Sequence, residues 1–509
     1  MNRDTQRGVV AAGHPLSARC GAEALCAGGN AVDAALGAML AAYVCEPLLT
    51  GLGAGGYMLV VPPGGRPVLL DFFVEAPGRE PGPGPRAELE PVSISFGDAV
   101  QVFNIGVASV GCWGMPAGVC EASRRFGRLP LQELVAPAVR LAREGVTITP
   151  EQAYITELLG GIVTSTPECA ALFAPHGRLL GSGDRMRQPE LADTLQRLGQ
   201  EGSHPFYDGD ISAAILDWLG ARGGVVTQAD LAAYRVIDRE PIRVDYRGHE
   251  VLTNPPPSPG GLLIARALAL LTHTGGAPQM TDIAEVMQTV QRERTAAFTA
   301  GLEDPGFAAR YLAGGHDGPA GPAAPSRLGS TTHVSVLDAE GWACSVTCSN
   351  GSASGVVVPG TGIQLNNMLG EQDLNPDGFH RHRPGRRMPS MMSPTVVLAG
   401  GRPVLAVGSA GSNRIRSAIL QTIVRSIDEG RPASEAVDAP RIHWEDGIVY
   451  AEPGIDTAAL TAAGFEVSHF REPNLFFGGA QAAARDASGR FSGGGDPRRG
   501  GASVVVGAP

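Results

Sequence analysis

The chain of 509 residues is 43% hydrophobic and 18% charged, a composition that excludes a disordered protein and fits one large globular unit or several smaller ones. Its net charge of −11 argues against a nucleic-acid partner, because such partners require clustered Lys and Arg. The eight cysteines are scattered without a C-x-x-C pair. The first ten residues have no apolar run of signal-peptide length, and the most apolar later stretch, residues 262–271, is too short to span a membrane. We therefore expect a cytoplasmic, soluble protein with buried thiols and no membrane partner.

The beginning of the chain alternates between strands and apolar helices. The expected elements are strands over residues 8–12, 57–61 and 68–73 and helices over residues 14–28 and 31–44. The glycines of residues 51–56 formally match G-x-G-x-x-G, but a dinucleotide fingerprint follows a strand and opens a helix. Here the order is reversed, so we expect close backbone packing at these glycines and no cofactor.

The middle of the chain is predicted to be mainly helical, from residue 150 to residue 310. A helix is expected to begin near Leu129, because the apolar residues that follow recur with the period of a helix. Strands are expected over residues 107–112, 242–246 and 250–252. A flexible run rich in Gly, Pro and Ala, residues 312–326, closes this part.

After residue 331 the chain becomes rich in strands. The expected strands cover residues 334–337, 343–347, 355–360, 363–367, 394–398, 404–408, 448–451 and 502–506. One helix is opened by residues 408–413 and closed by Gly430, with isoleucines at four-residue spacing from Ile415 to Ile427. Strand pairs mixed with long helices predict an α+β fold, a layered αββα sandwich.

Thr331 is the residue on which our functional hypothesis depends. It follows the loose run directly and heads a strand, an arrangement that suits a threonine that becomes a new N-terminus. If the bond between Ser330 and Thr331 is cut, the freed α-amine can act as the base for the hydroxyl of the same residue.

The residues resemble the γ-glutamyltranspeptidase family of N-terminal-nucleophile hydrolases over nearly the whole chain. The matching segments are His14-Pro15-Leu16, residues 28–35, Glu46-Pro47, residues 51–53, 127–130 and 255–258, Thr331-Thr332-His333, residues 360–363, Asn366-Asn367, residues 393–395 and residues 408–414. The resemblance implies a four-layer αββα fold formed by two subunits from one precursor. Residues 1–330 would form the large subunit and residues 331–509 the small one, paired as a heterodimer that acts on a small molecule.

The same resemblance implies roles for four catalytic residues. Thr331 would attack the substrate carbonyl and form an acyl-enzyme, and Ser349 stands where the family has a second Thr that bonds the nucleophile. Gly411 and Ser412 match the Gly-Gly pair of the family's oxyanion hole. Their place at the start of a helix agrees with this role, because free N–H groups there favour negative charge. A simple helix cap at Ser412 is compatible with it.

Several substrate-binding positions depart from the family pattern. Phe73 stands where the family has an Arg that holds the substrate's α-carboxylate, and loss of such a charged contact costs roughly 1.5–3 kcal/mol. Met368 replaces a Gln, and Ser390-Met391 replaces a Ser-Ser clamp. The remaining aligned positions are Asn350, blurred by a short deletion over residues 351–354, and Glu371 for the family's acid. We expect the acyl pocket to be altered from standard γ-glutamyl recognition. Three arginines are candidates for a relocated cation or for structural roles: Arg386, Arg387 and Arg414.

Alternatives stay open for both the site and the function. His380 and His382 could begin a metal site but lack a third ligand at metal-site spacing, so no metal is expected. His333 is expected to be a packed strand residue, and Asp496 and Arg498 a structural ion pair. Besides an amide hydrolase or acyltransferase, including a cephalosporin-type acylase or an oxamate amidohydrolase, two readings remain. One is a C–C bond hydrolase using Thr331 in alkylproline-type antibiotic biosynthesis, and the other is a non-catalytic homologue.

Overall fold

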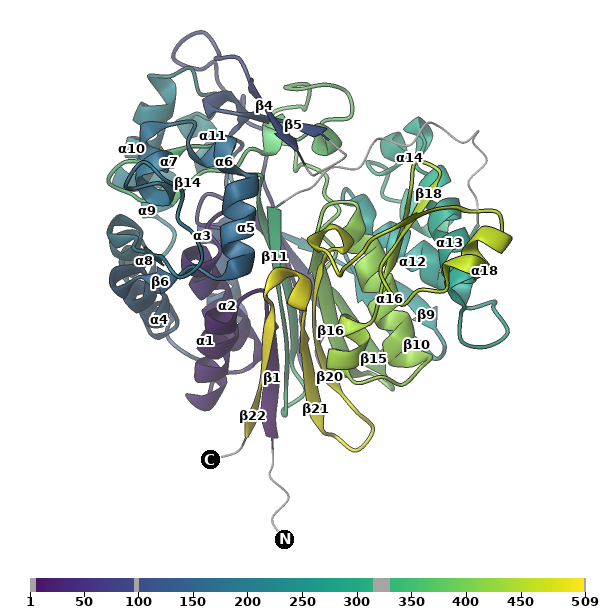
Figure 1. The fold of residues 1–509 in the computed structure, drawn as a ribbon. Coiled ribbons are helices and arrows are strands. Elements are labelled where there is room, and N and C mark those ends of the chain that lie inside the picture. The colour runs from purple at the N-terminus through teal and green to yellow at the C-terminus, as the bar shows by residue number, and fades with distance from the viewer. Residues whose placement is uncertain (1–5, 96–99, 315–329, 508–509) are drawn as a thin grey trace.

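Two β-sheets lie face to face at the centre of the molecule, and helices cover the outer face of each (Figure 1). The computed structural model describes residues 6–95, 100–314 and 330–507. Its layers follow the order helix, sheet, sheet, helix, so the expected αββα sandwich of the α+β class is confirmed. Within the described ranges no helix is long and apolar enough to cross a membrane.

The first sheet has seven strands, and every neighbouring pair in it is antiparallel. In spatial order they are β22 (Ala502–Gly507), β1 (Gln6–Ala12), β11 (Ser330–Asp338), β12 (Ala343–Gly351), β2 (Gly55–Val61), β3 (Val68–Phe72) and β8 (Ile237–Arg239). Strands from both sides of residue 330 are therefore interleaved within one sheet.

The second sheet has six strands, again antiparallel throughout. In spatial order they are β21 (Phe491–Gly495), β20 (Gly479–Arg485), β16 (Arg402–Ala410), β15 (Thr395–Ala399), β10 (His249–Thr253) and β9 (Ile242–Tyr246). The remaining strands form small pairs or triplets: β4 (Glu90–Ser95), β5 (Val100–Ile105), β6 (Val146–Thr147), β7 (Arg185–Met186), β13 (Val357–Val358), β14 (Ile363–Gln364), β17 (Ile442–Glu445), β18 (Ile448–Ala451) and β19 (Glu466–His469).

Helices α1 (Pro15–Cys26) and α2 (Ala31–Cys45) pack on the first sheet, and α12 (Pro259–Leu271) and α16 (Arg414–Ile427) pack on the second (Figure 1). The expected isoleucine stripe of α16 is its core face, since Ile415, Ile419 and Ile423 are buried. The other helices are α3 (Met115–Phe126), α4 (Leu131–Glu144), α5 (Pro150–Leu158), α6 (Gly160–Val163), α7 (Pro167–Phe173), α8 (Pro189–Glu201), α9 (Pro205–Asp208), α10 (Asp210–Gly220), α11 (Gln228–Ala233), α13 (Met280–Arg292), α14 (Ala296–Gly301), α15 (Phe307–Leu312), α17 (Ala433–Asp438) and α18 (Thr457–Ala462).

Alternating side chains of the central strands fill two separate cores. In β1, Val9 packs between the sheets whereas Val10 packs under α1 and α2. In β2, Leu59 likewise packs between the sheets and Met58 packs under the helices. Because both faces are covered, these strands read as continuous apolar runs rather than as an alternating pattern.

One expected strand is wrong. Residues 107–112 do not form a strand; a 3₁₀ helix occupies Val107–Ser109. The preceding Gly106 has a φ of 89°, a left-handed conformation that cannot continue a strand from β5. The apolar side chains Val110 and Cys112 are nevertheless buried, so the pattern reported burial correctly and conformation incorrectly.

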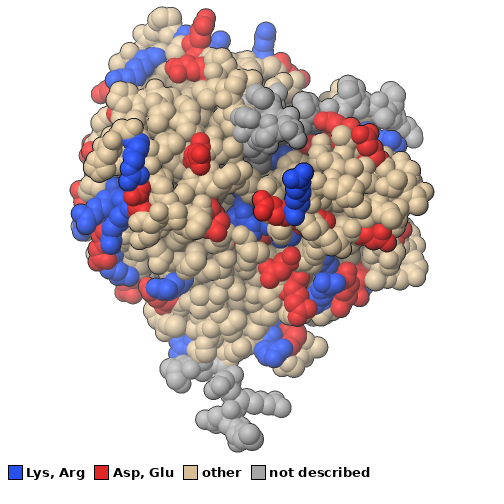
Figure 2. Space-filling model, in the orientation of Figure 1, with Lys and Arg blue, Asp and Glu red and all other residues tan. Residues whose placement is uncertain are grey.

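Charged side chains lie mostly outside these cores. Figure 2 shows acidic and basic side chains interspersed over one face of the molecule. Many are paired, as in the exposed contacts of Arg66 with Glu240 and of Arg125 with Asp238.

Candidate active site

The Ser330–Thr331 peptide lies at the end of β11, beside the end of β12. Thr331 is buried, and its hydroxyl donates to Ser349 Oγ at 3.3 Å. Ser349 Oγ in turn donates to the carbonyl oxygen of Ser330 at 2.5 Å. One side chain of β12 thus contacts both residues of the bond at which the sequence predicts cleavage.

The register of this strand pair shifts at the same bond. Ser330 lies opposite Gly351 while Thr331 lies opposite Ser349, so Asn350 is an extra residue on β12. Asn350 is buried on the other side of the strand, where its amide donates to the carbonyl of Pro47. Bulges of this kind occur next to active sites because they re-aim side chains.

A cavity of about 410 Å³ opens in front of Thr331. Eight of the residues expected from the sequence lie in its wall: Thr331, Ser349, Ser412, Phe73, Met368, Glu371, Ser390 and Met391. Three expected residues do not line it: Asn350, Gly411 and Ser330 of the predicted cleavage site. Asn350 is turned away by the bulge and Gly351 lines the cavity instead, and Gly411 lies directly behind Ser412.

The connection between β16 and α16 has an unusual backbone. Gly411 has a φ of 120° and Ser412 a φ of 52°, in the left-handed region that a serine rarely adopts. Within the described chain, the backbone N–H groups of Gly411 and Ser412 donate to no other residue. Strained backbone held in this way is typical of functional sites, and free N–H groups at a helix start favour an anion. The Ser412 hydroxyl donates to Asp373, a cavity residue that the sequence did not indicate.

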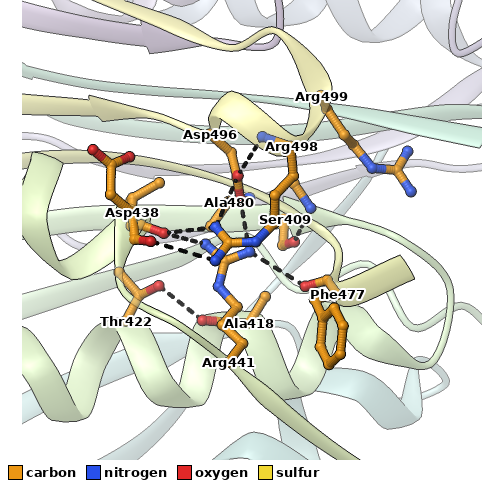
Figure 3. Close-up of polar contacts among 12 residues, drawn as sticks. Ser409, Ala418, Thr422, Asp438, Arg441, Phe477, Ala480, Asp496, Arg498 and Arg499 are labelled. Carbon is orange, nitrogen blue, oxygen red and sulfur yellow. Dashed lines mark hydrogen bonds and ion pairs between the residues drawn. The ribbon is translucent and has the colours of Figure 1, made fainter. Parts of the chain in front are cut away.

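A buried network of charges supports this connection from behind (Figure 3). The carboxylate of Asp496 accepts from Arg441 at 2.6 Å and from the backbone N–H of Ala480 at 2.8 Å. Arg498 pairs with both Asp496 and Glu452, so the ion pair expected from the sequence is part of a larger cluster. Because Ala480 lies opposite Ser409 in the β16–β20 pair, the cluster fixes the strand that ends at the strained connection.

Glu371 is the acid of the cavity. Its carboxylate accepts from the backbone N–H of Ser352 at 2.9 Å and from the Ser352 hydroxyl at 2.5 Å. The amide of Asn367 completes this arrangement by donating to the Ser352 hydroxyl. Burial raises the pKa of Glu371 to about 7, so its charge changes in the physiological range.

Apolar side chains occupy the positions where the family resemblance implies polar ones. Phe73 is buried and stacks on Tyr57 with ring centroids 5.3 Å apart. Met368 and Met391 line the same cavity, together with Met392. This part of the wall can therefore hold hydrocarbon but offers few partners for an amino-acid head group.

None of the three arginines considered as relocated cations lines the cavity. Arg387 pairs with Asp71 and donates to the carbonyl of Phe73, and Arg386 pairs with Glu303. Arg414 donates to the carbonyl of Phe476. The arginine that does line the cavity is Arg294, which the sequence gave no reason to select.

Comparison with known proteins decides the family. The model described as gamma-glutamyltranspeptidase matches residues 17–506. The chain belongs to the γ-glutamyltranspeptidase family. An acylase ACY 1 proenzyme from Pseudomonas sp. (strain SE83) is 34% identical over 530 residues, covering 98% of this chain and 94% of the relative. A glutathione hydrolase proenzyme from Escherichia coli (strain K12) is 31% identical over 538 residues, covering 97% and 90%.

A solved structure gives the same result. The cephalosporin acylase from Bacillus halodurans superimposes with a TM-score of 0.81 at 27% identity, covering 98% of this chain and 96% of that chain. The chain is accordingly an enzyme of the hydrolase and acylase type, with the fold of the γ-glutamyltranspeptidase family, as the sequence motifs predicted.

Within this family fold, the residue after Thr331 also has a buried partner. The hydroxyl of Thr332 donates to Glu46 at 2.9 Å, which joins β11 to the end of α2. Burial raises the pKa of Glu46 to about 7. The second oxygen of this carboxylate has no hydrogen-bond partner among the described residues. The Glu46-Pro47 motif therefore contacts β11 at the residue that follows Thr331.

The histidines considered as functional residues have local partners. His333 bonds to the hydroxyls of Thr347 and Ser335, and burial lowers its pKa to about 3, so it is a neutral packed residue. His382 bonds to the carbonyl of Leu374. Among the described residues, no group of three His, Cys, Asp or Glu side chains could hold a metal ion.

Proposed function

We propose that this chain is a self-cleaving threonine hydrolase or acyltransferase whose nucleophile is Thr331. The observation that carries the proposal is the position of Ser349, which contacts the carbonyl of Ser330 and the hydroxyl of Thr331 at the mouth of a cavity. The relatives named as proenzymes support it, since a proenzyme requires a processing step.

The cleavage begins within the intact chain. Thr331 Oγ1 attacks the carbonyl carbon of Ser330, the C–N bond breaks, and an ester forms while the α-amine of Thr331 is released. Ser349 assists by donating to the Ser330 carbonyl oxygen, where negative charge develops. Water then hydrolyses the ester, leaving residues 1–330 and residues 331–509 as two chains.

Turnover uses the same threonine with its new amine. The amine takes the hydroxyl proton as Thr331 Oγ1 attacks the substrate carbonyl, and the proton passes to the leaving amine. The backbone N–H groups of Gly411 and Ser412 hold the oxyanion. The acyl-enzyme is resolved by water or by an acceptor amine.

The acyl pocket is adapted to a group other than γ-glutamyl. Phe73, Met368 and Met391 supply apolar surface where the family's polar contacts would lie, whereas Ser390 and Glu371 keep their positions in the wall. The relatives named acylase are consistent with such a change. We expect γ-glutamyl-p-nitroanilide to be a poor donor, and turnover comparable to that of an ordinary family member would contradict this.

The first experiment compares the unmodified chain with Thr331→Ala and Thr331→Ser on a denaturing gel. The unmodified chain of 52.6 kDa should give two bands, of roughly 34 and 19 kDa in proportion to residues 330 and 179. Thr331→Ala should stay intact, and Thr331→Ser should still be cut because it keeps a hydroxyl. A fully active chain that remains uncut would overturn the proposal.

The sequence offers a direct readout for the released amine. The sequence has no lysine, since all 40 of its Lys and Arg residues are arginine. The fragment of residues 331–509 therefore contains no lysine amine. An amine-selective reagent should therefore label this fragment at one place, the α-amine of Thr331. Absence of the label from a correctly cut fragment would remove the proposed base.

Cleavage of a C–C bond is the second candidate, and the same apolar wall favours it. A ketone carbonyl next to Thr331 would be attacked in the same way, with a carbon group leaving in place of an amine. Product analysis separates the two, because an amide donor releases an amine and a ketone donor does not. A role in antibiotic biosynthesis would follow only from the second outcome.

A further inference from the structure

A single cation lies in the described wall of the cavity. Arg294 follows α13 and precedes α14, and the other charged side chains of the wall are Glu371 and Asp373. The connection between α13 and α14 also contributes Thr295, and α14 contributes Phe298 and Leu302. Arg294 therefore enters the cavity from elements that carry none of the residues proposed for catalysis.

The guanidinium of Arg294 is poorly neutralised. No described carboxylate lies within 4.0 Å of it, in contrast to Arg386 and Arg387, which both form ion pairs. Its recorded hydrogen bonds run from Nη1 to the neutral amide oxygens of Gln291 and Asn413, both at 3.3 Å. Within the described chain, no bond is recorded from its Nε or Nη2, although guanidinium carries five N–H donors.

Leaving such a charge half-satisfied is unfavourable. Burial lowers the pKa of Arg294, while the negative charges of Asp373 and Glu445 oppose this effect without forming an ion pair with it. Arginine stays protonated in proteins, so the charge persists and calls for an anionic partner. The Nε–Nη2 edge of the guanidinium matches a carboxylate, which it can bind with two parallel hydrogen bonds.

Arg294 is hydrogen-bonded to the connection that would hold the oxyanion formed from the substrate's reacting carbonyl. Asn413, which accepts from Arg294, follows Ser412 directly in the connection that holds the proposed oxyanion donors. The wall nearby is apolar, with Phe298, Leu302 and Ile415. A carboxylate at Arg294 would thus be joined to the scissile carbonyl through a short hydrocarbon segment.

We infer that Arg294 binds a carboxylate of the substrate, so that the enzyme acts on acids whose carboxylate is separated from the reacting carbonyl by a short apolar chain. Phe73 has no charge and cannot bind a carboxylate as the family's Arg does at that position. Arg294 provides the charge instead, from a different part of the chain and in different surroundings. This inference rests on the proposed function of Thr331. The carboxylate can belong to the acyl group or to the leaving amine, and both place the same chemistry at the guanidinium.

The first test measures binding without catalysis. Glutarate has the carbon skeleton of glutamate without its amino group, and glutaramide is its uncharged counterpart. Calorimetry should show glutarate binding at least 10-fold more tightly to the unmodified enzyme than to Arg294→Gln, with no such difference for glutaramide. Arg292→Gln removes an exposed charge from the last turn of α13 and serves as the matched control.

The second test measures selectivity during turnover, with two pairs of substrates. Glutaryl-p-nitroanilide and its terminal amide report a carboxylate on the acyl group, and butyryl-4-aminobenzoate and butyrylanilide report one on the leaving amine. In one of the pairs, Arg294→Gln should lower kcat/KM for the acid by about 10- to 100-fold and leave the neutral member nearly unchanged. Arg294→Lys should keep part of the preference, and both variants should still be cut into two chains.

The outcomes separate this inference from the proposed function. Arg294-dependent glutarate binding by an enzyme that hydrolyses nothing would retain the carboxylate site and reject the catalytic proposal. Hydrolysis whose acid preference is the same in Arg294→Gln, Arg292→Gln and the unmodified enzyme, with no Arg294-dependent glutarate binding, would overturn the carboxylate site alone.

Discussion

Ser349 is the residue that, in the mechanism we propose, connects cleavage of the chain with later turnover. Its hydroxyl donates to the carbonyl of Ser330 and accepts from the hydroxyl of Thr331. Ser349→Ala removes both contacts, so we expect cleavage to slow by about 100- to 1,000-fold, a typical loss for one donor to a developing oxyanion. A time course on denaturing gels after synthesis measures it. Ser349→Thr keeps the hydroxyl and should cut at a near-normal rate, and equal rates for both variants would contradict the role.

Glu46 makes stability depend on pH. Burial raises its pKa from 4.5 in the unfolded chain to about 7 in the fold, so its protonated form stabilises the fold. That contribution is complete below pH 4.5 and is lost as the pH rises to about 7, by an amount on the order of 3 kcal/mol. Glu46→Gln cannot titrate and should lessen the decline of the unfolding midpoint over this interval, while Glu371, with the same raised pKa, accounts for the rest. Glu88→Gln, at an exposed site, should leave it unchanged, and an equal decline in all three proteins would be the contrary result.

Among the secondary-structure elements, the β16–α16 connection is the one that tolerates least change. A Cβ on Gly411 would lie 2.9 Å from the Cα of Gly478, at a φ of 120°. Gly411→Ala must therefore displace the backbone that presents the N–H groups, and we expect kcat to fall by about 100-fold or more in a folded protein. Gly430→Ala also places a side chain at a positive φ, of 65°, but there a Cβ meets nothing within 4 Å, and it should remain active. Similar kcat values for the two variants would remove the connection from the oxyanion hole.

The elements also mark where sequence reasoning succeeded and where it could not. Helices such as α2 and α16 were predicted within a residue or two, because caps and runs or stripes of apolar residues are local signals. The prediction of a strand over residues 107–112 was wrong, because the apolar character of a segment indicates its burial and not its backbone conformation. The order of strands in each sheet was out of reach, since neighbours such as β1 and β22 are separated by almost the whole chain.

The candidate site shows the same division between local and distant signals. Motif order led to Thr331, Ser349 and Ser412, which the structure brings to one cavity. Asn350 could not be placed, because a single-residue bulge decides which side of β12 it occupies. Arg294 is one of 40 basic residues in the sequence, and only the fold brings it to Asn413, 119 positions away.

On the scale of the whole molecule, cleavage should not separate the two chains. In the first sheet, β22, β11 and β12 follow residue 330, whereas β1, β2, β3 and β8 precede it, and the two groups interleave. Dissociation would break the β22–β1, β1–β11 and β12–β2 pairs together and expose both cores. We expect the two bands to elute as one species in gel filtration without denaturant and to part only in denaturant. Separate elution of the fragments in plain buffer would contradict the interleaved sheet.

The neighbours of β1 also determine when the sheet can be completed during synthesis. This strand is translated long before both of its partners, since β11 begins at Ser330 and β22 at Ala502. Strand β1 stays unpaired along both edges until β11 has been made, and along one edge until residues 502–507 have been made. The first sheet is thus completed only after β22 has been made, and Thr331 gains its full surroundings only then.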